Sequence, residues 1–231
     1  MLTLENAVLD NDGFRVTASF SVEEGERIAI IGPSGAGKST LLAGLSGFLP
    51  LQSGRMLWNG EDISSVGPSE RPVSTVFQDN NLFPHLTAFQ NVGLGIRAST
   101  RLNTNETDIV MNALNRVGLR GLEDRKPGQL SGGQQSRVVL ARVLVRDKPI
   151  LLLDEPFAAL GPALKVEMIE LVTQLSQAEG TTVLMVTHDP ADARRFADRT
   201  IVVSDGVARP PEPTGPLLAA PPEDLRIYLG Q

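Results

Sequence analysis

The chain has 231 residues, of which 41% are hydrophobic and 21% charged, and its formal net charge is −6. This composition excludes a disordered or collagen-like chain, and the acidic balance argues against a nucleic-acid-binding surface, which normally needs a basic stripe. Cysteine is absent, which excludes disulfides and thiolate chemistry. No apolar run approaches the roughly 18 residues that a membrane-spanning helix requires.

Strands and helices alternate in the first and last thirds of the chain. Short apolar or β-branched runs predict buried strands, and apolar residues at helical spacing predict helices. The expected strands are 27–31, 55–58, 73–77, 150–153, 182–187 and 200–203, and the expected helices are 38–48, 163–178 and 190–197. Such alternation is typical of a largely parallel α/β sheet.

The middle third of the chain differs in kind. Residues 104–117 and 134–146 have helical patterns with no convincing strand between them, so we expect a helical lobe inserted into the sheet. We expect a single domain with a core lobe at about 1–79 and 148–210, a helical subdomain at about 80–147, and a tail at 211–231. The tail is rich in proline, and we expect loop with a short final helix there.

The strongest local motif lies between the first expected strand and the first expected helix. It fits G-x-x-x-x-G-K-[ST] and consists of Gly32, Pro33, Ser34, Gly35, Ala36, Gly37, Lys38, Ser39 and Thr40. Backbone N–H groups of such a loop surround a phosphate, and the helix N-terminus adds partial positive charge. Lys38 would bridge the outer phosphates and Ser39 would hold Mg²⁺. A plain glycine turn is the alternative, but the strand before it and the helix after it favour phosphate binding.

Two acidic residues follow the apolar run at 150–153. Ligands of α/β sheets bind where the strands end, which is where Asp154 and Glu155 emerge. Asp154 can take part in Mg²⁺ coordination, and Glu155 can polarise an attacking water as a general base. Two solvated acids after a core strand would be the alternative, and the phosphate-binding loop favours the functional interpretation.

A third motif precedes the helix expected at 134–146. It consists of Leu130, Ser131, Gly132, Gly133 and Gln134. Glycines at this place can form either a helix cap or a nest of N–H groups that binds an anion, and the residues alone leave both open.

Together these motifs resemble the ATP-binding subunits of ABC transporters over essentially the whole chain. GPSGAGKST resembles the Walker A motif, LSGGQ the family signature, and ILLLDEP the Walker B segment with its catalytic glutamate. Gln78 matches the glutamine of the Q-loop, and His188 matches the switch histidine. The five motifs occur in the family's order and approximate spacing.

The resemblance implies a P-loop NTPase fold of the ABC ATPase type. Its core sheet would be mainly parallel, with an N-terminal antiparallel β part and an inserted helical subdomain. Glu155 and His188 would be catalytic, with His188 near the γ-phosphate and the attacking water. Mg²⁺ would be held by Ser39, Gln78 and Asp154.

The resemblance also implies partners. Residues 131–134 would close over ATP bound by the other subunit of a homodimer. Two membrane permease subunits or halves would contact the helical lobe near Gln78, and a periplasmic solute-binding protein would take part indirectly. This places the chain peripherally on the cytoplasmic face of the inner membrane, with no nucleic-acid partner.

Two positions depart from the family's pattern. Gly161 stands where the D-loop of the family usually has an aspartate, which puts the coupling between two ATP sites in doubt. The loop expected at 9–12 lacks the aromatic residue that stacks on adenine, and Phe14 is expected to face the core. We therefore expect modest selectivity among nucleobases.

Finer resemblance narrows the class. Segments 71–74, 77–83, 85–87 and 90–95 resemble the ATPases of thiamine importers. Importers of polyamines or iron are the alternatives. Two remote alternatives are a soluble ABC ATPase that acts on nucleic acid or ribosomes and a nucleotide sensor without enzymatic activity. The sensor is disfavoured by the intact set of Lys38, Asp154, Glu155 and His188.

Overall fold

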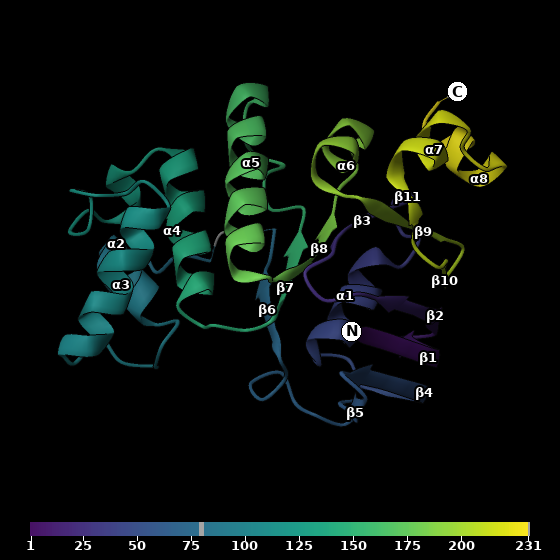
Figure 1. Ribbon diagram of the computed structural model, residues 1–231, viewed down its shortest axis with the longest axis horizontal. Helices are drawn as coiled ribbons and strands as arrows, with labels where there is room; N and C mark the ends of the chain where they lie inside the picture. Colours follow the sequence, from purple (N-terminus) through teal and green to yellow (C-terminus); the bar gives the residue numbers. More distant parts are fainter. Residues whose placement is uncertain (79–80, 231) are drawn as a thin grey trace.

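The computed structural model describes residues 1–78 and 81–230 (Figure 1). One mixed sheet runs through the core in the strand order β5-β4-β1-β2-β10-β9-β3-β8-β7-β6, with β11 beside β9. The strands are β1 (Leu2–Asn11), β2 (Phe14–Val22), β3 (Arg27–Ile31), β4 (Leu51–Trp58), β5 (Glu61–Asp62), β6 (Val73–Val76), β7 (Ile150–Asp154), β8 (Thr182–Val186), β9 (Arg199–Ser204), β10 (Val207–Ala208) and β11 (Glu212–Pro213). The α-helices are α1 (Lys38–Ser46), α2 (Ala88–Gly93), α3 (Thr104–Arg116), α4 (Gly132–Leu144), α5 (Pro162–Glu179), α6 (Pro190–Phe196), α7 (Thr214–Ala219) and α8 (Glu223–Tyr228).

Strands β9, β3, β8, β7 and β6 run parallel and are covered on both faces. In β3, Ile28 and Ile30 face the cluster that includes α1, whereas Ala29 and Ile31 face the cluster that includes α5 and α6. A strand buried on both faces is mostly apolar, as the central strands β3, β7 and β8 are, whereas β6 and β9 also bury Ser74 and Thr200. Strands β1, β2, β4 and β5 pair antiparallel. The predicted mainly parallel sheet with an N-terminal antiparallel part is therefore confirmed.

Helices α2, α3 and α4 pack together beside α5 and form the part of the molecule farthest from β1 in Figure 1. Their buried apolar residues join the core cluster on the α5 face of the sheet. Each of the three helices begins with a capping box, from Thr87, Asn103 and Ser131 respectively. The sequence did not predict α2, because six residues are too few to show a helical period. The lobe boundary expected at 79–80 lies outside the described residues.

Several predicted bounds were wrong. The expected loop at 9–12 is mostly strand: β1 continues to Asn11, and the turn is Asp12-Gly13, both at positive φ. Strand β4 begins at Leu51 rather than 55, because Leu51 pairs with Leu9 of β1. Helix α4 begins at Gly132 rather than 134, because the Ser131 side chain accepts the Gln134 N–H and caps the helix.

The tail is more ordered than its composition predicts. It forms β11, α7 and α8, and buries Leu217, Leu218 and Leu225 against the rest of the molecule. Arg194 of α6 donates a hydrogen bond to the Leu218 carbonyl at 2.9 Å. Both helices have six residues and are preceded by proline, so proline marks their starts instead of excluding helix. The expectation of loop with one short helix was wrong.

Arg71 is almost completely buried, with 1% of its surface exposed. Its guanidinium donates to the carbonyls of Gly44 at 2.6 Å and Leu45 at 2.9 Å, at the carboxyl end of α1. It also donates to the carbonyls of Ser64 and Val66, at 3.0 and 2.8 Å. A cation at this end of a helix interacts favourably with the helix dipole. Arg71 therefore joins α1 to the segment that enters β6.

We expect Arg71→Lys to lower the free energy of unfolding by about 2–4 kcal/mol, because one ammonium cannot reach carbonyls that the planar fork spans. Urea unfolding, with an unchanged dependence on denaturant, measures this loss. Arg55→Lys is the control, since Arg55 is exposed and paired only with Glu5 among the interactions described; its effect should stay within about 0.5 kcal/mol. Equal losses in the two variants would contradict the role given to Arg71.

Candidate active site

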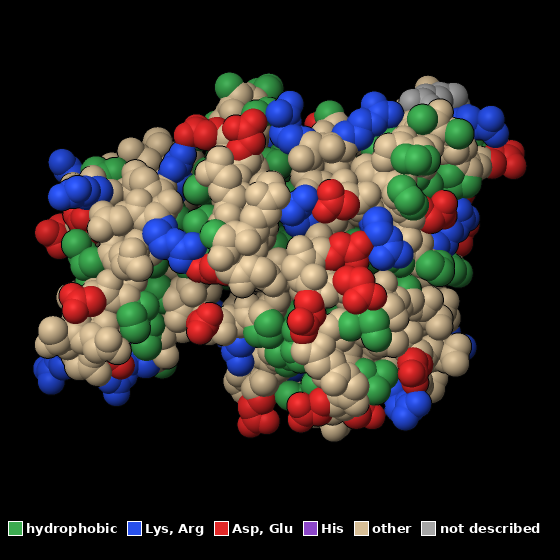
Figure 2. All heavy atoms as spheres, in the orientation of Figure 1, with side chains coloured by type: hydrophobic (Ala, Val, Ile, Leu, Met, Phe, Trp, Pro, Cys, Tyr) green, Lys and Arg blue, Asp and Glu red, His purple; other side chains and the backbone are tan. Residues whose placement is uncertain are grey.

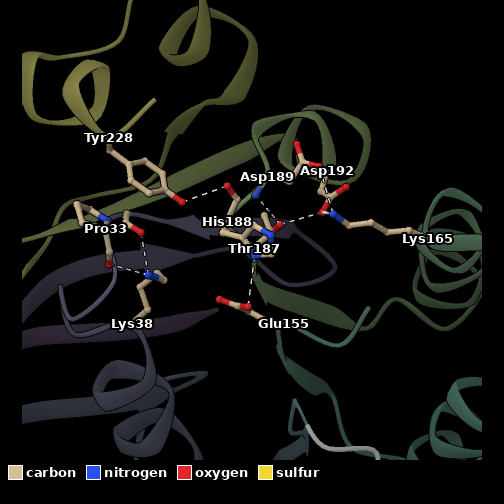
Figure 3. Close-up of polar contacts among 10 residues, drawn as sticks. Pro33, Lys38, Glu155, Lys165, Thr187, His188, Asp189, Asp192 and Tyr228 are labelled. Atoms are coloured by element: carbon tan, nitrogen blue, oxygen red, sulfur yellow. Dashed lines mark hydrogen bonds and ion pairs between the residues drawn. The ribbon is translucent and has the colours of Figure 1, made fainter. Parts of the chain in front are cut away.

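The glycine-rich loop between β3 and α1 is shaped by positive φ angles at Gly32, Gly35 and Gly37. A Cβ on Gly32 would lie 1.9 Å from the Val203 carbonyl oxygen of β9, so only glycine fits there. The Lys38 Nζ donates to the carbonyls of Gly32 and Pro33, both at 2.8 Å, and so lies over the loop (Figure 3). Burial lowers the pKa of Lys38, while the nearby Glu155 and Asp154 carboxylates oppose that shift.

Asp154 ends β7, close to Ser39 at the start of α1, and the two line one hollow with Thr75. Burial raises the pKa of Asp154, and repulsion by Glu155 raises it further, whereas Lys38 lowers it. The carboxylate and the Ser39 hydroxyl are hard oxygen donors.

Glu155 and His188 come together although 33 residues separate them. The Glu155 Oε2 and the His188 Nδ1 lie 3.3 Å apart (Figure 3). An imidazole nitrogen and a carboxylate oxygen at this distance can share one hydrogen bond. Glu155 has a φ of +44°, a left-handed conformation that a residue with a Cβ adopts at a cost of roughly 1–2 kcal/mol.

A buried polar network holds the segment on both sides of His188. The Thr187 hydroxyl donates to Asp192 at 2.9 Å, and the Asp189 N–H donates to the Thr187 hydroxyl at 3.1 Å. Lys165 of α5 pairs with Asp192 at 2.6 Å and with Asp189 at 3.2 Å. Burial opposes protonation of Lys165, yet its hydrogen bonds to Asp192 and Asp189 raise its pKa above the usual value.

Sequence reasoning missed Lys165 and Asp192. Lys165 is one of four lysines in the chain, and only its ion pairs across α5 and α6 show its role. The sequence offered only a weak signal for Asp192, which lies four residues after His188 in the short helix α6.

The remaining predicted residues divide into two groups. Gln78 is exposed and follows β6, whose Val76 pairs with Leu153 just before Asp154, so it lies at the same edge of the sheet. The signature residues 131–134 do not join the cluster. They start α4, which lies on the far side of α5 from α1 in Figure 1. A Cβ on Gly132 would lie 3.7 Å from Leu160, just before Gly161.

Phe14 does not face the core as predicted. It begins β2 with 40% of its surface exposed. A Cβ on Gly37 would lie 3.0 Å from the Cε1 atom of its ring, so the ring lies beside the glycine-rich loop. The two-residue turn at Asp12-Gly13 leads directly into Phe14, the first residue of β2.

The oxygen donors fit Mg²⁺ on chemical grounds. Ser39, Gln78 and Asp154 supply a hydroxyl, an amide oxygen and a carboxylate. Among the described residues, no group of three or more His, Cys, Asp or Glu side chains could hold a metal by itself. Mg²⁺ usually takes one or two carboxylates and completes its shell with water and substrate phosphates, so this sparse set fits it.

A glycine-rich loop between a buried strand and a helix, with carboxylates at the neighbouring strand end, defines a P-loop nucleotide-hydrolysing protein. The family model for ABC transporters matches residues 16–158. The thiamine import ATP-binding protein ThiQ of Cereibacter sphaeroides is 57% identical over 230 residues, covering 100% of both chains. The chain therefore belongs to the ABC transporter family and is an ATPase of that type.

Solved structures agree with this assignment. The ADP conformation of an ATP-binding cassette of an ABC transporter matches with a TM-score of 0.89 and 28% identity, over 100% of this chain and 99% of that one. A dimeric post-hydrolysis state of an ATP-binding cassette bound to ADP and phosphate matches with a TM-score of 0.78 and 31% identity, over 93% and 99%.

The outer surface carries mixed charge. On the face in Figure 2, acidic and basic side chains are interspersed over the described residues. Among those residues, no helix combines the length and the apolar character needed to cross a membrane.

The left-handed backbone of Glu155 predicts how substitutions there change the free energy of unfolding. We expect Glu155→Gly to be more stable than Glu155→Ala by about 1 kcal/mol, because glycine adopts the left-handed conformation without strain. Both variants remove the same carboxylate, so their difference isolates the backbone contribution. Urea unfolding of the pair measures it, and the reverse order of stability would show that φ at 155 is not positive in solution.

Proposed function

We propose that this ATPase energises an importer of thiamine and its phosphate esters. Support comes from the full-length relative at 57% identity whose name states thiamine import. The loop and carboxylates described at the site address phosphates and water rather than the vitamin. The cargo would be selected by a periplasmic binding protein and a permease.

The pairing of Glu155 with His188 beside Lys38 is the observation that carries the catalytic proposal. Glu155 accepts a proton from the attacking water, and the 3.3 Å contact from His188 orients its carboxylate. The His188 side chain is 56% exposed, so its other ring nitrogen would be accessible to the attacking water and the γ-phosphate. Lys38 and the backbone N–H groups of the loop residues other than Pro33 would neutralise the phosphate charge that develops.

Mg²⁺ would be held by Ser39, Gln78 and Asp154. When bound, it would screen the negative charge of the outer phosphates. Asp154 is suited to this because burial and Glu155 disfavour its unpaired negative charge, which a nearby cation would relieve.

We infer that the active form is a homodimer. Residues 131–134 start α4, where Ser131 and Gln134 form a capping box, and they lie away from the loop at 32–40 of their own chain. The dimeric relative shows that such cassettes pair. A second copy would bring its signature residues to this ATP. Gly161 lacks a side chain to reach across that interface, which weakens the coupling between the two sites.

An exposed aromatic pair is the surface we assign to the permease. The rings of Phe48 and Phe77 lie 5.8 Å apart, and 61% and 43% of the residues' surfaces are exposed. Both rings and Leu42 line the hollow that also contains Ser39 and Asp154. Exposed apolar patches of this kind mark protein contacts. Two permease subunits or halves would hold the dimer at the cytoplasmic face of the inner membrane.

Phe14 is the residue we assign to the nucleobase. Its exposed ring beside Gly37 lies where a base would extend from phosphates held by the loop. Stacking on one ring tolerates every base, because each base has a π-face. Modest selectivity among nucleotides is expected for this reason.

We expect Phe14→Leu to raise the KM for ATP about fivefold to tenfold while kcat changes less than twofold, since stacking contributes about 1–3 kcal/mol per base. Steady-state hydrolysis by the purified chain measures this, and hydrolysis rates for ATP, GTP and CTP should be comparable. Phe83→Leu is the matched control, because Phe83 is 46% exposed, close to the 40% of Phe14, but lies outside the site. A hundredfold preference for ATP would contradict the proposal.

The cargo is tested by uptake in cells. Deletion of the gene should abolish uptake of labelled thiamine and growth on limiting thiamine, and the parent chain should restore both. Glu155→Gln should restore neither, because it binds ATP but lacks the base. Uptake of labelled putrescine and iron serves as control. Normal thiamine uptake in the deletion strain would overturn the cargo and leave the ATPase assignment standing.

A further inference from the structure

The C-terminal helix α8 reaches the catalytic site. The Tyr228 hydroxyl donates a hydrogen bond to the backbone carbonyl of His188 at 3.1 Å (Figure 3). The residue lies on the last turn of α8, 40 positions further along the chain, in the tail that the sequence alone left without a role.

Helix α8 is held firmly enough to place that hydroxyl. Leu225 is 1% exposed and belongs to the core cluster on the α5 face of the sheet. Asp224 pairs with Arg209 at 2.6 Å, just after β10. The preceding helix α7 is tied by the Thr214 hydroxyl to Thr200 of β9 at 2.9 Å. The tail is therefore seated on the same sheet that carries the site.

The other described side-chain interactions of this segment hold the neighbours of His188 and do not hold its backbone carbonyl. Lys165 and Asp192 fix the residues on either side, Thr187 and Asp189. Tyr228 binds the carbonyl of His188, whose ring is 56% exposed and contacts Glu155 at 3.3 Å. Rotation of that peptide would move the ring relative to the carboxylate.

We propose that Tyr228 is a positioning residue for His188, so that the tail takes part in ATP hydrolysis by holding the switch histidine against Glu155. The inference rests on the catalytic role proposed for His188. Burial raises the pKa of Tyr228, and the Glu155 and Asp189 carboxylates raise it further, so the hydroxyl stays protonated and remains a donor at neutral pH.

The test uses Tyr228→Phe in the purified full-length chain, which removes one oxygen and keeps the ring. We expect kcat to fall about fivefold to tenfold and the KM for ATP to stay within about twofold, since one hydrogen bond is lost and the phosphate loop is untouched. Ile227→Ala is the control, because Ile227 is the neighbouring residue and is 72% exposed. An unchanged kcat in Tyr228→Phe would overturn the proposal.

A double-mutant cycle separates positioning from general damage. In a His188→Ala background, Tyr228→Phe should cause no further loss, because it acts through the removed ring. A full additional loss would show that Tyr228 acts elsewhere. If His188→Ala itself kept full turnover, the proposed catalytic role of His188 would fail, which is a separate outcome from failure of Tyr228→Phe alone.

The chain also provides an internal spectroscopic control, because His85 and His188 are its only histidines. Histidine-selective NMR of Tyr228→Phe should shift or broaden the His188 ring signals and leave those of His85 in place. Unchanged His188 signals would contradict the positioning role, whereas equal changes at both residues would indicate a global effect and also overturn it.

Discussion

Burial of the parallel strands on both faces is the constraint on which the site depends. Strands β3, β7 and β8 have no face on which a polar side chain could reach water, so polar chemistry emerges only where each strand ends. Because these strands are parallel and adjacent, their ends lie at one edge. The loop before Lys38, the Asp154-Glu155 pair and His188 meet there for this reason.

That edge of the sheet brings positive and negative side chains together where they are partly shielded from water. Burial works against both Lys38 and Asp154, and their mutual attraction only partly offsets it. A site of this kind is stabilised when phosphate and a cation complete the pattern of charge. Any ligand that binds the folded site in this way also stabilises the folded protein.

Much of this could be predicted from sequence because the signals are local. The loop at 32–40, the strand ending at Asp154 and the signature at 131–134 are each encoded in consecutive residues, and the alternation of strands and helices gave the sheet. The residues that escaped prediction act through distant partners. Phe14 was expected in the core because a lone aromatic residue usually lies there, and only its proximity to Gly37 shows otherwise.

The tail shows the same limit. Its prolines argued for loop, but Leu217, Leu218 and Leu225 gain more from burial against β9 and α6 than six-residue helices lose by being short. Tertiary packing decided the local structure there. Lys165 is similar, since only the folded chain brings α5 to the turn that follows β8.

The buried guanidinium of Arg71 has a mechanical consequence. Arg71 lies two residues before β6 and binds the last turn of α1. The first turn of α1 holds Lys38 and Ser39, and β6 ends just before Phe77 and Gln78. The Arg71 side chain thus connects α1 to the segment that leads into β6. A displacement of the phosphate loop that moved α1 would therefore also move the segment that leads through β6 to Gln78.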